Sequence, residues 1–175
     1  DSVCVVDLDR ETVTATFSVG AEPEGIAVDE HTGDVYVANQ EDDTLSVIDP
    51  NSYETKYELA LGNNPIRVVP SPDGEYVFVP NRLSDDLSVI DTSVEREVRF
   101  TPDREMIEGG TQPWEVKRIP VGVWPGGTVF NDDGSRAFVA NNKTNDVSVI
   151  DIDSLEEIER YDTGIHPDGI DYLPE

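Results

Sequence analysis

The hydrophobic residues of this chain fall into short runs separated by turn residues, and four such runs make up each period of the sequence. In the first complete period the runs lie at 25–29, 34–39, 44–49 and 53–61. Val, Ile, Tyr and Phe dominate them, which is typical of β-strands. Turn pairs such as Asp73-Gly74 separate the first run from the second and predict tight hairpins. The segment 155–161 (LEEIERY) stands at a fourth-run position, so we predict a strand there rather than a helix.

Three short sequence motifs, which we call words, recur in the same order and with the same spacing along the chain. LSVID at 45–49 returns at 87–91, as VSVID at 147–151 and as VCVVD at 3–7. YVAN at 36–39 returns as FVPN at 78–81 and FVAN at 138–141, and a Gly-led element begins at Gly20, Gly62, Gly122 and Gly164. Equivalent positions lie 42 residues apart except for one interval of 60, so 18 residues are added between Asp91 and Gly122.

A period of this length with four strands predicts an all-β fold, a β-propeller of four-stranded antiparallel blades. The chain forms one domain, 1–175, with the insertion at about 101–118, between the third and fourth strands of one blade. It starts at a third run (2–7) and ends in a first run (169–175), which gives about 3.7 blades. We therefore expect an arc of a larger propeller, most simply one of seven blades.

The repeat units resemble the YVTN family of propeller repeats. The resemblance rests on VYVANQEDDTLSVIDP (35–50), YVFVPNRLSDDLSVIDT (76–92), AFVANNKTNDVSVIDI (137–152) and the upstream G-x-x-P-x-G element in three of four copies. Related repeats occur in archaeal surface-layer and other cell-surface proteins, in lactonase-like propellers and in propellers of nitrite reductases and amine dehydrogenases. The resemblance thus implies the fold and leaves several functions open.

The net charge of the chain limits the kinds of partner that it can bind and the environments in which it is expected to occur. There are 38 acidic against 12 basic residues, a formal net charge of −26 spread through every segment. Such a surface repels itself in dilute buffer and is relieved by salt, so we expect a halophilic source. The same charge argues against binding of nucleic acid, and the absence of a long apolar run argues against membrane insertion. We expect an extracellular or cell-surface location, or the cytoplasm of a salt-accumulating organism.

Residues that recur in every unit are predicted to be structural. We expect turn or cap roles for the strand-end residues Asp7, Asp49, Asp91, Asp151, Asn39, Asn81 and Asn141. The acidic segments between second and third runs, such as Glu41-Asp42-Asp43 and Asp85-Asp86, are expected to be solvated loop tips. Cys4 replaces a serine of the other units and is expected to be a small residue on a buried strand.

The residues that differ between units are the candidates for ligand binding. The connections from a fourth run to the next first run should lie on one face, around the central channel. The residue before the proline there varies, and one unit has Arg in place of a Gly. The candidate ligand-binding residues are Trp124, His166, Arg67, Glu22 and Asn64. An aromatic ring, an imidazole and a guanidinium in such places could hold an anionic or planar ligand. The alternative is that variable loop residues simply vary.

The insertion is a candidate arm for binding a partner. Its basic and apolar side chains are Arg104, Met106, Trp114, Lys117 and Arg118. The alternative is a long hairpin without a function of its own.

The sequence has no motif for catalysis, covalent heme, a metal or a nucleotide. We therefore predict no catalytic residue, metal or cofactor, and a non-enzymatic repeat scaffold for protein or ligand recognition. Two alternatives stay open: a fragment of a propeller enzyme or redox subunit whose active groups lie in missing blades, and a structural segment of a surface-layer protein. The expected partners are the remaining blades of a longer chain, a second copy or another protein, because an isolated arc exposes apolar faces and strand edges.

Overall fold

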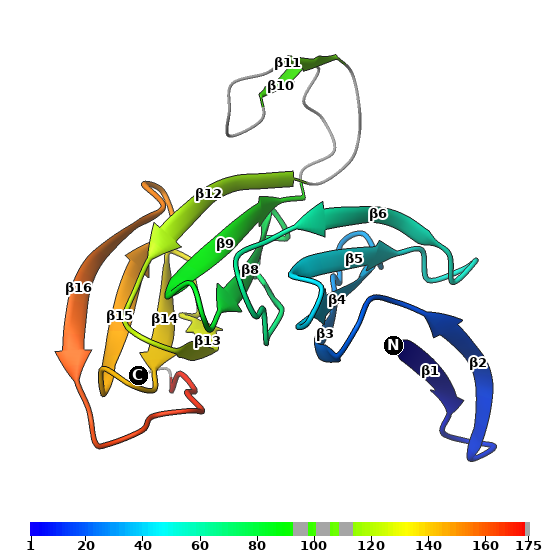
Figure 1. Cartoon of the computed structure of the whole chain (residues 1–175), viewed down its shortest axis with the longest axis horizontal. Helices are drawn as coiled ribbons and strands as arrows, with labels where there is room; N and C mark the ends of the chain where they lie inside the picture. Colours follow the sequence, from blue (N-terminus) through cyan, green and yellow to red (C-terminus); the bar gives the residue numbers. More distant parts are fainter. Residues whose placement is uncertain (93–97, 101–105, 109–113, 174–175) are drawn as a thin grey trace.

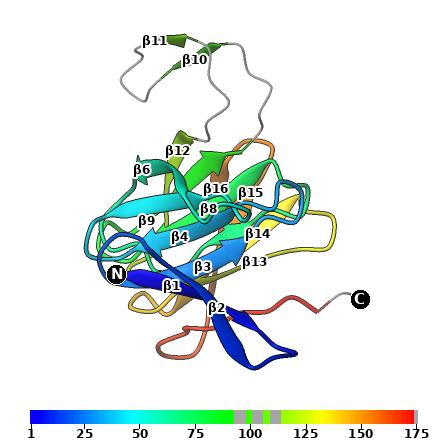
Figure 2. The ribbon, with the colours of Figure 1, turned by 90° about the vertical axis from the view of Figure 1, so that its right-hand side faces the viewer.

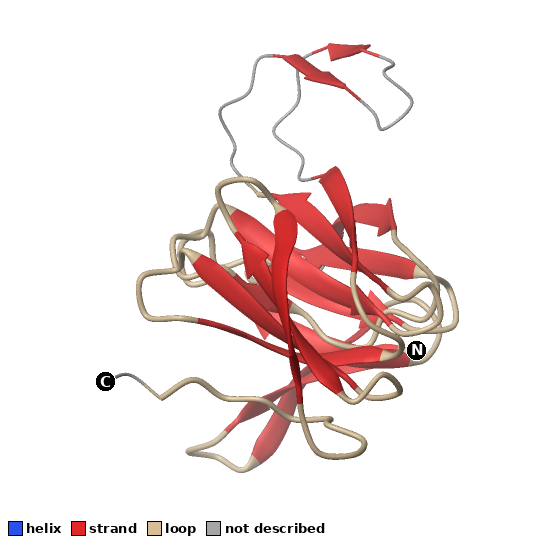
Figure 3. Cartoon of the chain, turned by 90° about the vertical axis from the view of Figure 1, so that its left-hand side faces the viewer, coloured by secondary structure: helices blue, strands red, loops and turns tan. Residues whose placement is uncertain are grey.

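The computed structural model of the chain describes residues 1–92, 98–100, 106–108 and 114–173. Every regular element in this part is a strand, as Figure 3 shows, so the predicted all-β class is confirmed. No helix in these residues has the length and apolar character needed to cross a membrane.

The strands form three four-stranded sheets and one two-stranded sheet that follow the predicted units. Sheet I consists of β1 (Ser2–Asp7) and β2 (Thr12–Ser18), and sheet II of β3 (Pro23–Val28), β4 (Val35–Asn39), β5 (Thr44–Ile48) and β6 (Thr55–Ala60). Sheet III has β7 (Val69–Pro70), β8 (Tyr76–Asn81), β9 (Asp86–Asp91) and β12 (Trp114–Pro120), while sheet IV has β13 (Pro125–Phe130), β14 (Arg136–Asn141), β15 (Asp146–Asp151) and β16 (Glu156–Asp162). All pairs are antiparallel, and the fourth-run segment LEEIERY is the strand β16 as predicted.

The sheets stand side by side in an open arc, from sheet I at one end to sheet IV at the other (Figure 1). Figure 2 shows the two-stranded sheet I in front of sheet II. The core lies between neighbouring sheets. One buried cluster joins sheets II and III through residues such as Tyr36, Leu45 and Val68, and a second joins sheets III and IV through residues such as Phe78, Val89 and Phe130. The words VYVA and LSVI are largely apolar because the second and third strands that they form are buried.

The hairpins between first and second strands close as the turn residues predict. Gly33, Gly74 and Gly134 have φ angles of 77°, 72° and 69°, a backbone conformation that side chains disfavour. Glycine at these places therefore fixes the register of each hairpin.

The last predicted strand, 169–175, is not formed in the residues described there. Its place is nevertheless that of a first strand, because Gly127 donates its N–H to the Asp168 carbonyl at 3.0 Å and Tyr172 stacks on Phe138 with ring centroids 6.0 Å apart. A strand needs a paired neighbour, and residues 169–173 form no ladder with another strand in the described structure. The prediction of a strand was wrong for this physical reason.

The insertion lies closer to the N-terminus than the sequence predicted. Only four residues separate the paired Asp151 and Glu156, whereas 22 separate the paired Asp91 and Trp114, so the 18 added residues all precede Trp114. The small sheet of β10 (Val98–Phe100) and β11 (Met106–Glu108) belongs to this insertion and projects beyond β12 in Figure 1. The predicted boundary at about 118 was therefore wrong, because residues 114–120 are needed as the fourth strand of sheet III.

Candidate functional site

The loop face, which we define by the residues Glu22, Asn64, Trp124 and His166 that precede the four prolines, has the same backbone in every unit. Their φ angles are 48°, 62°, 60° and 56°, in the left-handed region that residues other than glycine rarely adopt. The backbone N–H of each donates a hydrogen bond to a side chain. That of Asn64 donates to Asp43 Oδ1 at 2.7 Å, and that of Trp124 donates to Asp85 Oδ1 at 3.0 Å. A backbone repeated in this way belongs to the scaffold, and only the side chains that it presents can distinguish one unit from another.

The acidic segments beside this face are not the solvated loop tips that we expected. Asp43 and Asp85 accept the backbone N–H groups of Asn64 and Trp124. Asp42 Oδ2 accepts the N–H of Ala21 at 2.7 Å. Asp146 is buried and accepts a hydrogen bond from Asn141, and burial raises the pKa of Asp86 against the effect of its hydrogen bonds. The expectation failed because charge patterning does not reveal which carboxylates receive backbone N–H groups.

The buried amides of Asn39, Asn81 and Asn141 join the second and third strands of their sheets. Each donates through Nδ2 to the serine seven residues later, at 2.8–2.9 Å. The amides of Asn81 and Asn141 also donate to Asp86 and Asp146 at 2.7 Å. These contacts occupy the amide groups in the interior of the sheets, so they leave the three asparagines with a structural role.

The strand-end aspartates form Asx-type turns at three of their four positions. Asp49 Oδ1 accepts the N–H groups of Asn51 and Ser52 at 2.8 and 3.0 Å, and Asp7 and Asp151 accept equivalent bonds. Backbone hydrogen bonds lower the pKa of all three carboxyl groups. Asp91 is buried and pairs with Trp114 in the ladder, and the residues that follow it at 93–97 lie outside the described part of the chain.

Trp124 is the aromatic centre of the loop face. Its ring, which is 37% exposed, lies 4.4 Å from Lys143 Nζ and 5.6 Å from the Arg82 guanidinium carbon. Both cations follow the asparagine that ends a second strand, at Asn81 and Asn141, so they come from two different sheets. Arg82 and Lys143 were not predicted as site residues. Both lie within two residues after an asparagine that ends a second strand, and this position could have indicated them.

His166 and Asn64 make the equivalent contacts in the other units. His166 Nδ1 lies 3.3 Å from the Asn142 carbonyl, and Asn64 Oδ1 lies 3.4 Å from Gln40 Nε2. Gln40, Arg82 and Asn142 occupy equivalent positions, so each candidate residue contacts its own neighbouring sheet. The structure therefore spreads Trp124, His166 and Asn64 along the arc, and Glu22 is exposed at its end.

Arg67 lies apart from these residues, in a cavity of about 420 Å³ between the first strands. The lining includes Arg67, Glu24, Gly127 and Asp168, but not Trp124 or His166. The inner strands approach closely here, because a Cβ on Gly25 would lie 2.8 Å from the Arg67 Cα. Arg67 thus adds a guanidinium where the equivalent residues are Gly25, Gly127 and Gly169.

The cations of this region have no acidic partner in the described part of the chain. Several bases elsewhere are paired with acids, as in Lys56–Asp34 at 2.7 Å and Arg160–Glu157 at 2.7 Å. The side chains of Arg67, Arg82 and Lys143 form no ion pair or hydrogen bond among the described residues, in a chain of 38 acids. Unpaired cations beside an exposed indole and a cavity are suited to holding an anion.

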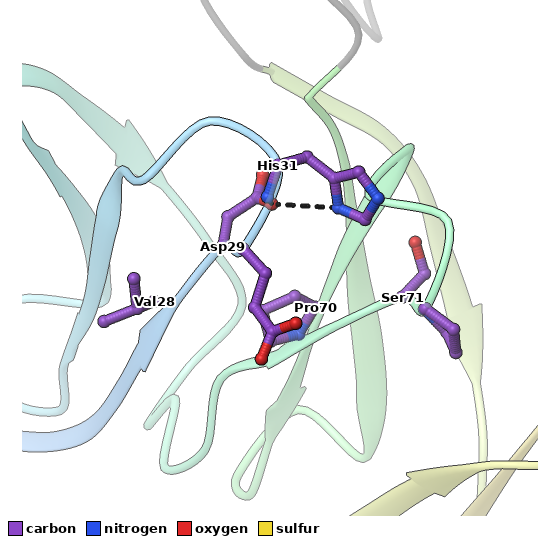
Figure 4. Close-up of a pocket in the computed structure, with 7 residues that line it drawn as sticks. Val28, Asp29, His31, Pro70 and Ser71 are labelled. Atoms are coloured by element: carbon purple, nitrogen blue, oxygen red, sulfur yellow. Dashed lines mark hydrogen bonds and ion pairs between the residues drawn. The ribbon is translucent and has the colours of Figure 1, made fainter.

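A second cavity, of about 220 Å³, lies between the hairpin turns of sheets II and III and contains Asp29, His31 and Ser71 (Figure 4). Asp29 Oδ1 lies 3.5 Å from His31 Nδ1. Ser71 Oγ, however, donates to Asp73 at 2.5 Å and accepts the N–H of Tyr76, and no hydrogen bond joins it to His31 in the described structure. The trio therefore builds turns and lacks the contact between nucleophile and base that acyl transfer needs.

The residues of the predicted partner arm lie in β12, in β11 and outside the described part of the chain. Trp114, Lys117 and Arg118 belong to β12 and not to the insertion, which corrects their assignment. Lys117 and Arg118 pair with Glu156 and Glu115 at 3.5 and 3.0 Å, so both charges are already used within the sheets. Met106 begins β11, and Arg104 lies outside the described residues.

Cys4 is exposed, contrary to the expected buried position. The equivalent Ser46, Ser88 and Ser148 are buried, and each accepts a hydrogen bond from the asparagine of the paired second strand. In the described structure β1 pairs only with β2, and the Cys4 thiol lies 3.4 Å from Thr16 Oγ1. No group of three or more potential metal ligands occurs among the residues that the structure describes.

Comparison with known proteins supports the propeller architecture. A family model described as YNCE-like β-propeller matches residues 2–108. A search of curated proteins found no match. Among solved structures, hydrazine synthase from Kuenenia stuttgartiensis is 25% identical with a TM-score of 0.68, covering 86% of this chain and 40% of its own.

Two more solved structures share the fold at lower identity. A functionally unknown protein from Desulfotomaculum acetoxidans is 16% identical with a TM-score of 0.73, over 91% of this chain and 48% of its own. A streptogramin B lyase is 15% identical with a TM-score of 0.61, over 88% of this chain and 45% of its own. The chain therefore spans less than half the length of each of these three proteins.

Proposed function

Because this chain belongs to the YNCE-like β-propeller family, we propose that it is a recognition scaffold whose loop face and first-strand cavity bind an anionic ligand. The observation that carries this proposal is the set of unpaired cations Arg67, Arg82 and Lys143 around Trp124 and the cavity. The ligand would be a carboxylate or phosphate, which guanidinium and ammonium groups bind through charge-assisted hydrogen bonds.

The large negative charge of the chain does not oppose local anion binding in salt. Exposed charges farther apart than the Debye length, about 8 Å at physiological ionic strength, are largely screened. The nearest cations then dominate the potential that a small ligand experiences at the site. Asp85, whose Oδ1 accepts the Trp124 N–H, is the acid that works against binding at the loop face.

The setting that we propose is a non-enzymatic protein of the cell surface or the extracellular space of a halophile. The support is the net charge of −26 and the likeness of the repeats to those of surface proteins. A structural segment of a surface layer would share this setting without a ligand. In each case the chain would act as an arc of a larger propeller, most simply of seven blades.

The second candidate is a catalytic or redox protein of which this arc is a part. It is favoured by solved neighbours that are named as a synthase and a lyase. Among the described residues no serine, threonine or cysteine side chain is hydrogen-bonded to a histidine, so in this alternative the active groups lie in other blades.

The proposed function can be tested through the fluorescence of Trp124. In a Trp114→Phe background Trp124 is the only indole, so inorganic phosphate and citrate are titrated at constant ionic strength. We expect a saturable change with one of these anions. Arg82→Gln and Lys143→Gln, which remove the two cations beside the indole, should each weaken binding roughly tenfold, the value of one charge-assisted hydrogen bond.

The matched control is Arg136→Gln. Arg136 is also a cation without an ion pair, but it begins β14 at the end of sheet IV opposite the loop face. Its removal should leave the affinity unchanged. The proposal fails if neither anion gives a saturable signal, or if Arg136→Gln weakens binding as much as the loop-face variants do. Consumption of an anion in proportion to protein would favour the enzyme instead.

A further inference from the structure

The first-strand cavity, which is the cavity of about 420 Å³ that contains Arg67, is lined by charged side chains of both signs. The charged lining residues are Glu24, Arg67 and Asp168, which lie one or two residues after the prolines of three different units. The unit that contributes Gly126 and Gly127 has no charge at these two positions. The repeat therefore brings one base and two acids from separate units to a single cavity.

These opposite charges do not neutralise one another. The guanidinium of Arg67 forms no ion pair or hydrogen bond with a described residue, and the carboxylate of Asp168 forms none either. Glu24 is partly occupied, because its Oε2 accepts a hydrogen bond from Gln40 Nε2 at 2.6 Å. A base and an acid thus line the same cavity with their capacity for charge-assisted hydrogen bonds unused.

Gly126 leaves space between the unit of Arg67 and Asp168. A Cβ on Gly126 would lie 3.8 Å from Asp168 Oδ1 and 3.8 Å from the Cδ1 of Ile66, the residue that precedes Arg67. The backbone of Asp168 is fixed at this place, since its carbonyl accepts the Gly127 N–H at 3.0 Å. A longer side chain at position 126 would extend between the two units, and a small ligand has this space instead.

We propose that the first-strand cavity binds a zwitterion, namely a free α-amino acid with an apolar side chain. Arg67 binds the carboxylate of the ligand and Asp168 binds its ammonium group. The lining also includes Val69 and Ile170, which suit an apolar side chain. This inference rests on the proposed binding of a carboxylate in the cavity and adds the ammonium group as a second requirement.

A ligand with a single charge fits the cavity less well. An anion is repelled by the free carboxylate of Asp168, and a cation is repelled by Arg67, so each leaves one like charge beside it. An α-amino acid carries both groups on one carbon atom, and each group then has an opposite charge to bind. Its net charge is zero, so the −26 of the chain does not repel it as a whole.

The test compares three ligands that share one branched carbon chain. Leucine carries both charged groups, isocaproate lacks the ammonium group and isoamylamine lacks the carboxylate. Each is titrated into the protein at neutral pH and constant ionic strength, and binding is followed by saturation-transfer NMR. We expect leucine to bind at least about tenfold more tightly than either of the other two, because each of them loses one charge-assisted hydrogen bond.

Two variants should each remove one half of this preference. In Arg67→Gln, leucine should bind no more tightly than isoamylamine, and in Asp168→Asn no more tightly than isocaproate. Both side chains are exposed, so the circular dichroism spectrum should stay that of the wild type. The matched controls Arg136→Gln and Asp153→Asn remove the same charges from residues outside the cavity lining, and they should leave the affinity for leucine unchanged.

The proposal is overturned if leucine does not bind, or if isocaproate or isoamylamine binds as tightly as leucine. It is also overturned if the control variants weaken leucine binding as much as Arg67→Gln and Asp168→Asn do. Anion binding at the loop face is decided separately, by the response of Trp124 fluorescence to phosphate and citrate. Tight binding of isocaproate would keep the proposed anion function of the cavity and refute only the zwitterion.

Discussion

At the scale of single residues, a contact between glycine and asparagine sets the spacing of the repeat words. A Cβ on Gly62 would lie 2.5 Å from Asn81 Nδ2, and one on Gly20 would lie 2.6 Å from Asn39 Cγ. A Cβ on Gly122 would likewise lie 2.6 Å from Asn141 Cγ. In all three units the asparagine follows the glycine by 19 residues. The glycine that begins each Gly-led element is therefore required by the buried amide of the same unit.

This contact predicts a large difference between two substitutions of the same kind. Gly62→Ala should reduce the free energy of unfolding by about 1–3 kcal/mol, because the new methyl group overpacks a buried site. Gly164→Ala should leave it nearly unchanged, since no atom lies within 4 Å of a Cβ there. Urea denaturation of both variants checks this, and equal effects would show that the close contact carries no energy.

The turn aspartates predict a particular dependence of stability on pH. Backbone and side-chain hydrogen bonds from Ser154 lower the native pKa of Asp151, whereas the unfolded value is about 3.9. Its contribution is therefore full above the unfolded pKa and is lost as the pH falls through the native pKa. Asp151→Asn should lower stability near neutral pH and cease to differ from the wild type in strong acid.

The control for this experiment is Asp153→Asn, which removes the same charge from an exposed side chain that makes no hydrogen bond in the described structure. Urea denaturation of both variants is compared at pH 7 and at pH values below about 3. A pH-independent gap between the variants would contradict the assigned role of the Asp151 carboxylate.

At the scale of the elements, the insertion is an addition to a sheet that is already complete. β9 and β12 pair directly from Asp91 and Trp114 onward, as β15 and β16 do from Asp151 and Glu156. The connection between the two strands can therefore change in length without changing their register. Lengthening such a loop costs little, because closure entropy grows only slowly with length.

Replacing residues 92–113 by the four residues 152–155 should accordingly preserve the fold. We expect the same circular dichroism spectrum and a free energy of unfolding within about 1 kcal/mol of the wild type, the size of the loop-closure effect. A matched chain that also loses 114–120 should unfold, since it lacks the fourth strand of sheet III. If the first variant unfolds, the insertion is part of the scaffold and not an addition to it.

At the scale of the whole molecule, the net negative charge decides how the stability of the fold responds to salt. Ion pairs neutralise only a few of the 38 acids in the described structure, and backbone N–H groups hold several others. The remaining negative charges repel one another in the folded chain more than in the expanded one. Salt that screens them should therefore favour folding.

We predict that the midpoint of thermal unfolding rises as KCl is raised from about 0.1 M to 1 M, where the Debye length falls from about 10 Å to 3 Å. Sucrose of equal osmolality is the control, because it stabilises proteins by exclusion without screening charge. Circular dichroism at 218 nm or so follows the unfolding of the sheets. A midpoint that KCl leaves unchanged would remove the main support for a halophilic origin.

The sequence by itself determined the local architecture. Period-2 and continuous apolar runs, turn glycines and phased words specify strands, hairpins and the stacking of like units, because these depend on short-range patterning and on burial between identical neighbours. They correctly identified the blades of a propeller and a strand at 155–161, which the structure has at 156–162.

Only the tertiary structure decided which residues meet across sheets. Trp124 was visible as a variable residue, but Arg82 and Lys143 joined it from two other loops, while Arg67 proved to lie in a separate cavity. The hydrogen bonds of Asp43 and Asp85 to backbone N–H groups 21 and 39 residues away also depended on contacts between units, as did the exposure of Cys4. Contacts between units are set by the packing of one sheet on the next, and a one-dimensional pattern does not contain that information.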